Sequence, residues 1–310
     1  LVGSEMCIRD SACPIQKGGN NEIIPVVRQW MKEYKIPAYD EDRGTGIVRH
    51  IMGRTGVHSG EIMVCIVTAV PMVPHMKELV QMLRKDVPGL TSVIQNINSR
   101  HTNVILGNKT KVIYGSPTIS DSIGDLSFRI SAQSFFQVNS EQAQKLYDTA
   151  LSYADLKGNE TVVDVYCGTG TITLFLAKRA KFAYGIEIVE PAIRDAVKNA
   201  KDNGVKNAHF MCGDAAYKLP ELLRSGVKPD VIVIDPPRAG CEEKVLNAIA
   251  SVKPKRVVYV SCNPATLARD LAYMNTRGYE TQKVQPVDMF PQTHHVETVV
   301  LMSRVKERSD

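Results

Sequence analysis

The strongest constraint on the fold is the alternation of short apolar runs with helical segments over residues 161–303. This alternation is typical of βαβ units, whose strands lie parallel in one sheet. A longer helix, capped by Ser140, is expected just before it, at about 140–155. The sequence therefore predicts an α/β, Rossmann-like fold with a mostly parallel seven-stranded sheet. Strands are expected at Thr161–Tyr166, Phe182–Glu187, Ala208–Met211, Asp230–Asp235, Arg256–Ser261, 279–288 and 296–303.

The residues before this sheet have a mixed pattern that predicts a smaller α+β domain with antiparallel strands. A helix is expected at Ile23–Met31 with Pro25 in its first turn, and another at Pro74–Lys85. The expected division is a non-native or truncated remnant at 1–19, a central domain at 20–132 and the α/β domain at 133–310. The expected strands of the central domain are Ile47–Met52, Glu61–Thr68, Thr91–Asn98, Lys111–Tyr114 and Phe128–Ile130.

Composition excludes several classes of protein. Hydrophobic residues make up 44% of the chain and charged residues 23%, which is ordinary for a globular protein and excludes global disorder, collagen and coiled coil. The net charge of +5 is compatible with a polyanionic partner. The seven cysteines form no C-x-x-C pair, which argues against a disulfide framework or a zinc ribbon. No apolar run is long enough for a membrane span, so we expect a cytoplasmic protein.

A glycine-containing loop follows the first strand of the predicted sheet. Gly168 and Gly170 would let the backbone approach a ligand where the next helix begins. The dinucleotide fingerprint requires a third glycine, and Thr173 stands in its place. The loop therefore disfavours a nicotinamide cofactor and leaves other nucleoside ligands open.

Acidic residues follow three further strands of the same sheet. Glu187 comes about 20 residues after the loop, where a carboxylate can accept hydrogen bonds from ribose hydroxyls. Asp214 could meet the adenine amino group, and Asp235 ends the fourth strand. Together with the glycine loop, these acids favour an adenosyl ligand without a pyrophosphate, as in the class I S-adenosylmethionine-dependent methyltransferases.

Two residues near the end of the chain suggest catalysis. Cys262 lies between a buried strand and a helix, where the helix N-terminus is expected to lower the thiol pKa. Glu297 interrupts an apolar strand, which is costly unless the carboxylate is paired or functional. His294 and His295 are expected to orient the turn before it, and we expect no metal site.

The ordered motifs closely resemble those of the bacterial RNA uracil-5-methyltransferases, which make 5-methyluridine in 23S ribosomal RNA or tRNA. The resemblance covers the chain from about Cys13 to Arg304. It implies that Gln137, Tyr166, Glu187 and Asp235 contact the cofactor or its pocket, that Asp214 lies on the adenine side, and that Cys262 is the nucleophile and Glu297 the base. The motifs are Ser134–Asn139, Asp164–Gly170, Asp235–Arg238, Ser261–Asp270 and His295–Glu297.

The resemblance further implies transfer of a methyl group from S-adenosyl-L-methionine to C5 of a uridine in RNA, through a covalent bond between the cysteine and C6. The motifs favour 23S rRNA over tRNA, and no obligate protein partner is expected. The target base must leave its stack, and Phe135 or Phe136 could stack on it; we take Phe136 as the candidate. Arg238 and Arg269 could reach a phosphate or the uracil edge.

Many relatives also carry an N-terminal RNA-binding module and an iron–sulfur cluster. Cys13 resembles the last ligand of that cluster, and the other ligands would precede residue 1. We therefore expect an N-terminally truncated chain without an assembled cluster.

Three alternatives remain. One is an intact active site with impaired RNA capture. Another is an amino-group methylase, which the DPPR sequence at Asp235–Arg238 argues against. The third is a non-catalytic RNA-binding scaffold, which the presence of Cys262 and Glu297 argues against.

Overall fold

The computed structural model describes residues 18–305, so Cys13 and the cluster hypothesis lie outside the described residues. These residues divide into two compact units. The first contains the chain up to Ser122 together with Arg129–Gln133, and the second contains Ile123–Phe128 and the chain from Ser134 onward. None of the helices in the described range combines the length and apolar character that a membrane crossing needs.

The first unit is built on a four-stranded sheet in the order β1-β2-β3-β4. Its helices α1 and α2 share a core with the sheet, centred on Trp30, whose indole Nε1 donates to His75 O at 2.8 Å. The pairing differs from the expected antiparallel pattern, because β2 and β3 run parallel with α2 as their crossover. The elements are α1 (Gly18–Glu33), β1 (Val48–Thr55), β2 (Ile62–Thr68), α2 (Met76–Asp86), β3 (Leu90–Ile97) and β4 (Lys109–Gly115).

Two details of the residues before the seven-stranded sheet correct the sequence predictions. Pro25 lies inside α1, which begins at Gly18, so the proline does not mark the first turn. A strand at Thr118–Ile123 (β5) was not expected; it forms a hairpin with β6 (Leu126–Ser131). Buried and partly exposed side chains alternate along β5, as in a strand with one buried face. Its partly exposed residues are short and polar, so the sequence of β5 resembles that of a loop.

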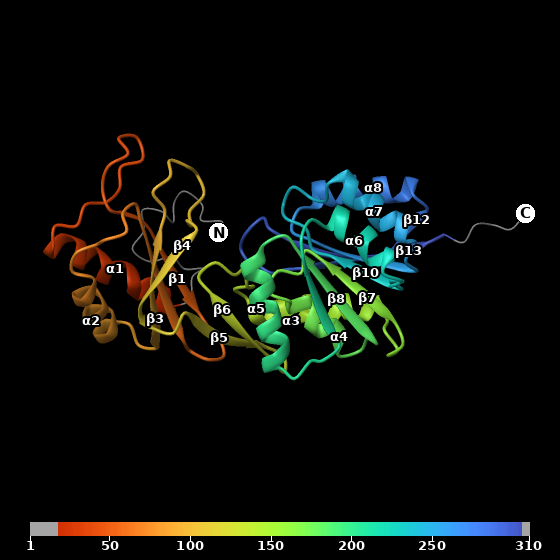
Figure 1. Ribbon diagram of the computed structural model, residues 1–310, viewed down its shortest axis with the longest axis horizontal. Coiled ribbons are helices and arrows are strands. Elements are labelled where there is room, and N and C mark those ends of the chain that lie inside the picture. Colours follow the sequence, from red (N-terminus) through yellow and green to blue (C-terminus); the bar gives the residue numbers. More distant parts are fainter. Residues whose placement is uncertain (1–17, 306–310) are drawn as a thin grey trace, which may run out of the picture. The chain divides into compact units, whose positions relative to one another are not determined.

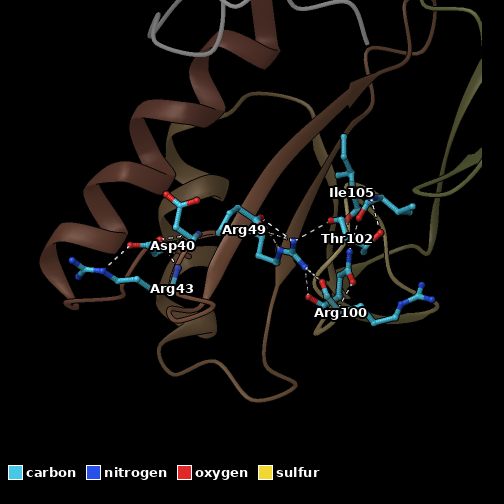
Figure 2. A network of polar contacts seen from close by, with 10 residues as sticks. Asp40, Arg43, Arg49, Arg100, Thr102 and Ile105 are labelled. Atoms are coloured by element: carbon cyan, nitrogen blue, oxygen red, sulfur yellow. Dashed lines mark hydrogen bonds and ion pairs between the residues drawn. The ribbon is translucent and has the colours of Figure 1, made fainter.

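A buried arginine joins two loops of the first unit (Figure 2). The Arg49 side chain is 1% exposed and forms an ion pair with Glu41 at 2.8 Å. Its guanidinium also donates to the carbonyl oxygens of Asn98, Arg100 and Thr102 at 2.6–3.4 Å. Because one side chain satisfies several loop carbonyls, Arg49 fixes the start of the segment between β3 and β4.

The second unit contains the predicted seven-stranded sheet, whose strand order is β12-β13-β11-β10-β7-β8-β9 (Figure 1). The central strands run parallel, and β13 runs antiparallel to both of its neighbours. The strands are β7 (Thr161–Val165), β8 (Phe182–Glu187), β9 (Ala208–Cys212), β10 (Val231–Ile234), β11 (Arg256–Ser261), β12 (Tyr279–Val287) and β13 (Glu297–Arg304).

Helices cover both faces of this sheet. On one face α6, α7 and α8 pack against the strands around Tyr259 in one continuous apolar core. On the other face, α3 packs against β11 and β13, and α4 against β7 and β8. The side chain of Asn139 caps α3 by accepting from Gln142 N, so the expected cap at Ser140 is wrong by one residue. The helices are α3 (Ser140–Ala154), α4 (Thr171–Ala177), α5 (Glu190–Asp202), α6 (Ala215–Arg224), α7 (Glu243–Val252) and α8 (Pro264–Thr276).

Candidate active site

The predicted functional residues of the second unit gather at one edge of the sheet, where the parallel strands end. Tyr166 follows β7, Glu187 ends β8, and Asp214 follows β9. Asp235 follows β10 and Cys262 follows β11. In an open α/β sheet this edge is where ligands bind.

The loop after β7 has an unusual backbone. Tyr166 has a φ of 71°, a conformation that costs free energy for a residue with a Cβ atom, and Gly168 and Gly170 also have positive φ. The turn is held because the backbone N–H groups of Tyr166 and Cys167 both donate to Ile186 O, at 2.9 and 3.0 Å. A Cβ atom on Gly170 would lie 3.0 Å from the Phe210 ring, so the close packing also favours glycine there.

Glu187 is connected to this loop by hydrogen bonds. Its carboxylate accepts from the backbone N–H of Gly168 at 3.2 Å and from that of Val189 at 2.8 Å. Both bonds orient the carboxylate at the end of β8, next to the glycine loop. A carboxylate in this position fits a ribose diol.

Asp214 has partners of its own in the protein. Its side chain caps α6 by accepting from Ala216 N at 2.9 Å, and it pairs with Lys244 Nζ at 2.8 Å. The hydrogen bond from Lys244 lowers the pKa of Asp214. These contacts hold Asp214 at the predicted strand end, although they also account for the residue structurally.

Asp164 is a buried acid to which the sequence assigned no role. Its Oδ2 accepts from the Thr173 hydroxyl at 2.6 Å, while its buried Oδ1 has no hydrogen-bond partner among the described residues. Burial raises the pKa of Asp164 to about 7. Thr173, which stands where the dinucleotide fingerprint has glycine, is therefore the partner of this acid.

The antiparallel direction of β13 brings Glu297 to Cys262. Ser261 on β11 pairs with Thr298 on β13, so Cys262 and Glu297 are the next residues in the same register. Glu297 is 6% exposed, while Cys262 and Asp235 are partly exposed. A thiol and two carboxyl groups thus lie together at this edge.

Burial changes the ionisation of this group. It raises the pKa of Glu297, and the Arg238 guanidinium partly opposes the shift. Burial, with the carboxyls of Glu297 and Asp164 nearby, raises the pKa of Asp235 well above the usual range. The predicted lowering of the Cys262 pKa is wrong: burial, Glu297 and Asp235 raise it, and Arg238 acts in the opposite direction.

The two predicted arginines have different surroundings. Arg238 is exposed, and its charge acts on Cys262 and Glu297. The Arg269 guanidinium instead donates to Asp270 at 2.8 Å and to the carbonyl oxygens of Ala239 and Cys241 at 3.0 and 3.2 Å. These contacts favour a role for Arg269 inside the protein rather than the expected contact with the substrate.

The aromatic pair before α3 is divided between core and surface. Phe136 is 7% exposed and its ring lies 5.7 Å from that of Phe128, so it packs in the core. Phe135 is 71% exposed and is the ring free to stack on a base. The choice of Phe136 from the sequence therefore has to be corrected, while Gln137, also predicted, is buried next to it.

Other elements complete the surroundings of the site. The Asn139 side chain donates to Met289 O at 3.1 Å and so connects the start of α3 to the turn before β13. In that turn the rings of His294 and His295 lie 4.0 Å apart. Tyr147 of α3, which the sequence did not suggest, is buried near the acidic group; burial raises its pKa. Among residues 18–305, no cluster of three or more His, Cys, Asp or Glu side chains is suited to hold a metal ion.

The chain is similar to proteins of known family. A family model described as tRNA (uracil-5-)-methyltransferase matches residues 58–305. An uncharacterised RNA methyltransferase of Clostridium acetobutylicum is 50% identical over 302 residues, which is 97% of this chain and 66% of that protein. Another, from Caldanaerobacter subterraneus subsp. tengcongensis, is 52% identical over 94% of this chain and 65% of that protein. The chain thus spans slightly less than two thirds of the length of these curated relatives.

A solved structure extends the similarity to the fold. The Pyrococcus abyssi tRNA (uracil-54, C5)-methyltransferase in complex with S-adenosyl-L-homocysteine superimposes with a TM-score of 0.78 and 28% identity, over 94% of this chain and 69% of that chain. The fold is therefore that of a class I methyltransferase, as the sequence predicts. Together with the match of the family model over most of the chain, this shows that the protein belongs to the tRNA (uracil-5-)-methyltransferase family.

Proposed function

We propose that this protein methylates C5 of a uridine in RNA, with S-adenosyl-L-methionine as methyl donor. The observation that carries the proposal is the register of β13 against β11, which brings a buried carboxyl, Glu297, next to the thiol of Cys262. A nucleophile for C6 and a base for the C5 proton are the two groups that this reaction requires.

The residues of the sheet edge fit a cationic nucleoside cofactor. Glu187 offers a carboxylate to a ribose, and the Gly168 and Gly170 backbone leaves room for close approach. Asp235 and Asp164 are acids with strongly raised pKa values, and a positive charge bound nearby would offset the desolvation that raises them. When bound, S-adenosyl-L-methionine would supply this positive charge as its sulfonium, which carries the electrophilic methyl group.

Cys262 activates the uracil ring of the RNA. Its thiolate adds to C6 of this ring, which breaks the C5–C6 double bond and makes C5 nucleophilic towards the methyl group. Burial and two carboxyls raise the pKa of this thiol and so oppose its deprotonation. The positive charge of Arg238 acts in the opposite direction and favours the thiolate. Because Arg238 also lowers the pKa of Glu297, one positive charge favours the ionised form of both the nucleophile and the catalytic base.

Glu297 completes the reaction. After methylation C5 carries both a proton and the new methyl group, and the carboxylate of Glu297 removes the proton. The electron pair of that C–H bond restores the C5–C6 double bond and expels the Cys262 thiolate. A base with a raised pKa is matched to this step near neutral pH.

The exposed ring of Phe135 is proposed to stack on a base of the RNA. Stacking on aromatic side chains is how many proteins hold unstacked bases, and the target uridine must leave its helix to reach Cys262. Arg238 is proposed to meet the uracil edge or a phosphate in addition to its effect on the thiol.

The decisive experiment uses RNA fragments that contain 5-fluorouridine, incubated with the protein and the methyl donor. Fluorine at C5 cannot leave as a proton does, so the covalent bond between Cys262 and C6 should persist and shift the protein on a denaturing gel. Cys262→Ala should form no adduct while binding the cofactor normally. If wild-type protein that binds cofactor forms no adduct, the thiolate mechanism is ruled out.

We propose 23S rRNA as the target, on the resemblance of the motifs to the ribosomal branch of the family. Transfer RNA is the second candidate, because the matching family model and the Pyrococcus abyssi protein are both described as acting on tRNA. Mapping 5-methyluridine in both RNAs, with and without the gene, distinguishes the two.

A further inference from the structure

The first turns of α8 reach back to the loop that follows β10. Cys262 stands just before this helix, and the next side chain, Asn263, donates to Arg238 O at 3.1 Å. The Thr266 hydroxyl, almost one turn further, donates to the same oxygen at 3.2 Å. The backbone of Arg238 is therefore fixed by the helix that begins beside the thiol.

The following turn of α8 binds the rest of that loop. Arg269 donates to Ala239 O and Cys241 O, and its Nε donates to Asp270 Oδ1. The other carboxylate oxygen of Asp270 accepts from Cys241 N at 2.8 Å. Arg269 and Asp270, which we call the clamp, thus bind backbone groups of residues 239 and 241, and α8 also binds the carbonyl of Arg238.

The carboxylate half of the clamp is built into the core, whereas the Arg269 side chain is 57% exposed. Asp270 is 1% exposed and accepts a third hydrogen bond, from the buried Tyr259 hydroxyl at 2.6 Å. The Cys241 thiol lies near the hydroxyls of both Tyr259 and Tyr166. A buried carboxylate is retained only when charge and hydrogen bonds satisfy it, and here Arg269, Tyr259 and the backbone do so.

Gly240 shows how closely the clamp surrounds the loop. A Cβ atom at this position would lie 2.6 Å from Arg269 Nη2 and 2.7 Å from Asp270 Oδ2. The φ of Gly240 is 76°, which also favours glycine. The loop therefore has neither the space nor the backbone conformation for a side chain where the clamp holds it.

We propose that Arg269 and Asp270 are positioning residues of the methyl transfer: by fixing residues 239–241 against α8, they hold in place the backbone that carries the Arg238 guanidinium beside the Cys262 thiol. The inference deepens the function proposed above and rests on it. It assigns to Arg269 a role inside the protein in place of contact with RNA.

The electrostatics of the site explain why this position matters. Glu297 of β13 and Asp235 of the β10 loop both oppose ionisation of Cys262, and Arg238 favours it. Arg238 also acts on His295, in the turn before β13. If residues 239–241 relax, the Arg238 guanidinium moves, while Glu297 stays on β13 and Asp235 stays next to the end of β10, so the thiol becomes harder to ionise.

The test measures the alkylation of Cys262 by iodoacetamide as a function of pH, followed by peptide mass spectrometry. Arg269→Ala should raise the apparent pKa of the reaction by about one unit, which is about tenfold slower alkylation below that pKa. The exposed Cys212 in the same samples should react at an unchanged rate. Arg277→Ala is the matched control, because this arginine lies at the end of α8 and donates to Tyr273 instead.

A double-mutant cycle separates positioning from general stability. Arg238→Ala should raise the apparent pKa of Cys262 alkylation by the same amount. The double variant Arg238→Ala, Arg269→Ala should have nearly the same pKa as either single variant, because both changes remove the effect of the Arg238 charge on the thiol. Shifts that add would overturn the proposal. So would an unchanged alkylation profile in Arg269→Ala that still binds cofactor, as shown by calorimetry.

If Arg269→Ala does not fold, Arg269→Lys decides. Lysine keeps the charge but lacks the planar fork that binds two carbonyls and Asp270 together, so an intermediate shift is expected. A wild-type profile in Arg269→Lys would count against the clamp. Since none of these measurements uses RNA, they remain valid even if the 5-fluorouridine experiment contradicts the proposed reaction.

Discussion

Glu297 and Cys262 stand next to each other in the register of β13 and β11, because Thr298 pairs with Ser261. A strand that runs parallel would bring its last residue to this edge, whereas antiparallel β13 brings its first. The base and the nucleophile thus come from segments 35 residues apart in the sequence (297 − 262).

Glu297→Gln should stop turnover after the methyl transfer rather than before it. The amide has nearly the same shape as the carboxyl but cannot accept the C5 proton, so the bond to Cys262 is not released. With ordinary uridine in the RNA, a methylated covalent complex should accumulate, and turnover should fall by about 10²–10⁴-fold. Gel shift with labelled methyl donor measures both. Release of product at the wild-type rate would exclude Glu297 as the base.

Methylation should accelerate as pH rises. Cys262 must lose its proton, and its pKa is raised by burial, Glu297 and Asp235. Glu297 must also be ionised to act as a base, and its pKa is raised by burial. Cys262 is needed for methyl transfer and Glu297 for the later release of product, so the rate of product release in a single turnover should fall as pH falls, by about tenfold per pH unit where the thiol alone limits it. An optimum on the acid side of neutrality would contradict this ionisation scheme.

Asp164→Asn should change how stability depends on pH. Burial raises the pKa of Asp164 from 3.8 to about 7, so the folded protein binds this proton more tightly than the unfolded chain does. Protonated Asp164 therefore contributes to the free energy of unfolding at acid pH, and this contribution is lost as pH rises from about 4 to 7.

The asparagine variant keeps an acceptor for Thr173 and never becomes charged. Relative to wild type, its free energy of unfolding should therefore gain up to about 4 kcal/mol by pH 8. Urea unfolding without cofactor at several pH values measures the difference. A constant difference between the two proteins would show that Asp164 is ionised throughout.

Phe135 and Phe136 should respond in opposite ways to truncation. Phe135→Ala should weaken RNA binding by about 1–3 kcal/mol, the usual worth of stacking on a base, and leave unfolding unchanged. Phe136→Ala should lower the free energy of unfolding by about 3–5 kcal/mol, because its ring packs against Phe128. Titration with RNA and urea unfolding of both variants check the assignment, and equal loss of RNA binding in stable variants would contradict it.

The α/β half of the fold was predictable because its central strands β7, β10 and β11 are rich in β-branched residues and because α3, α5, α6 and α8 begin at Pro, Asn or Asp. The same logic pointed to Asp235 and Cys262, which directly follow such runs, whereas Glu187 and Asp214 were singled out by their place at or just after the ends of β8 and β9. β5 was missed because only Ile119 and Ile123 are apolar in it, too few to distinguish a strand from a loop.

The surroundings of each side chain were harder to predict. The pKa of Cys262 depends on Glu297 and Asp235, which reach it only after three strands have paired. Phe135 and Phe136 are neighbours in a segment without regular period, so the pattern could not decide which of them is buried. The partners of Arg269 lie about thirty residues earlier in the chain, and only the folded loop reveals them.

The two neighbours of β13 pair with it in different ways. β11 and β13 pair without interruption from Arg256↔Ser303 to Ser261↔Thr298, whereas β12 contains a register shift between Thr281 and Lys283. A slip of one residue in β13 would turn Glu297 to the opposite face of the sheet. Insertions and deletions should therefore be tolerated in the outer strand, where an irregularity already exists, and should abolish activity anywhere between Glu297 and Ser303.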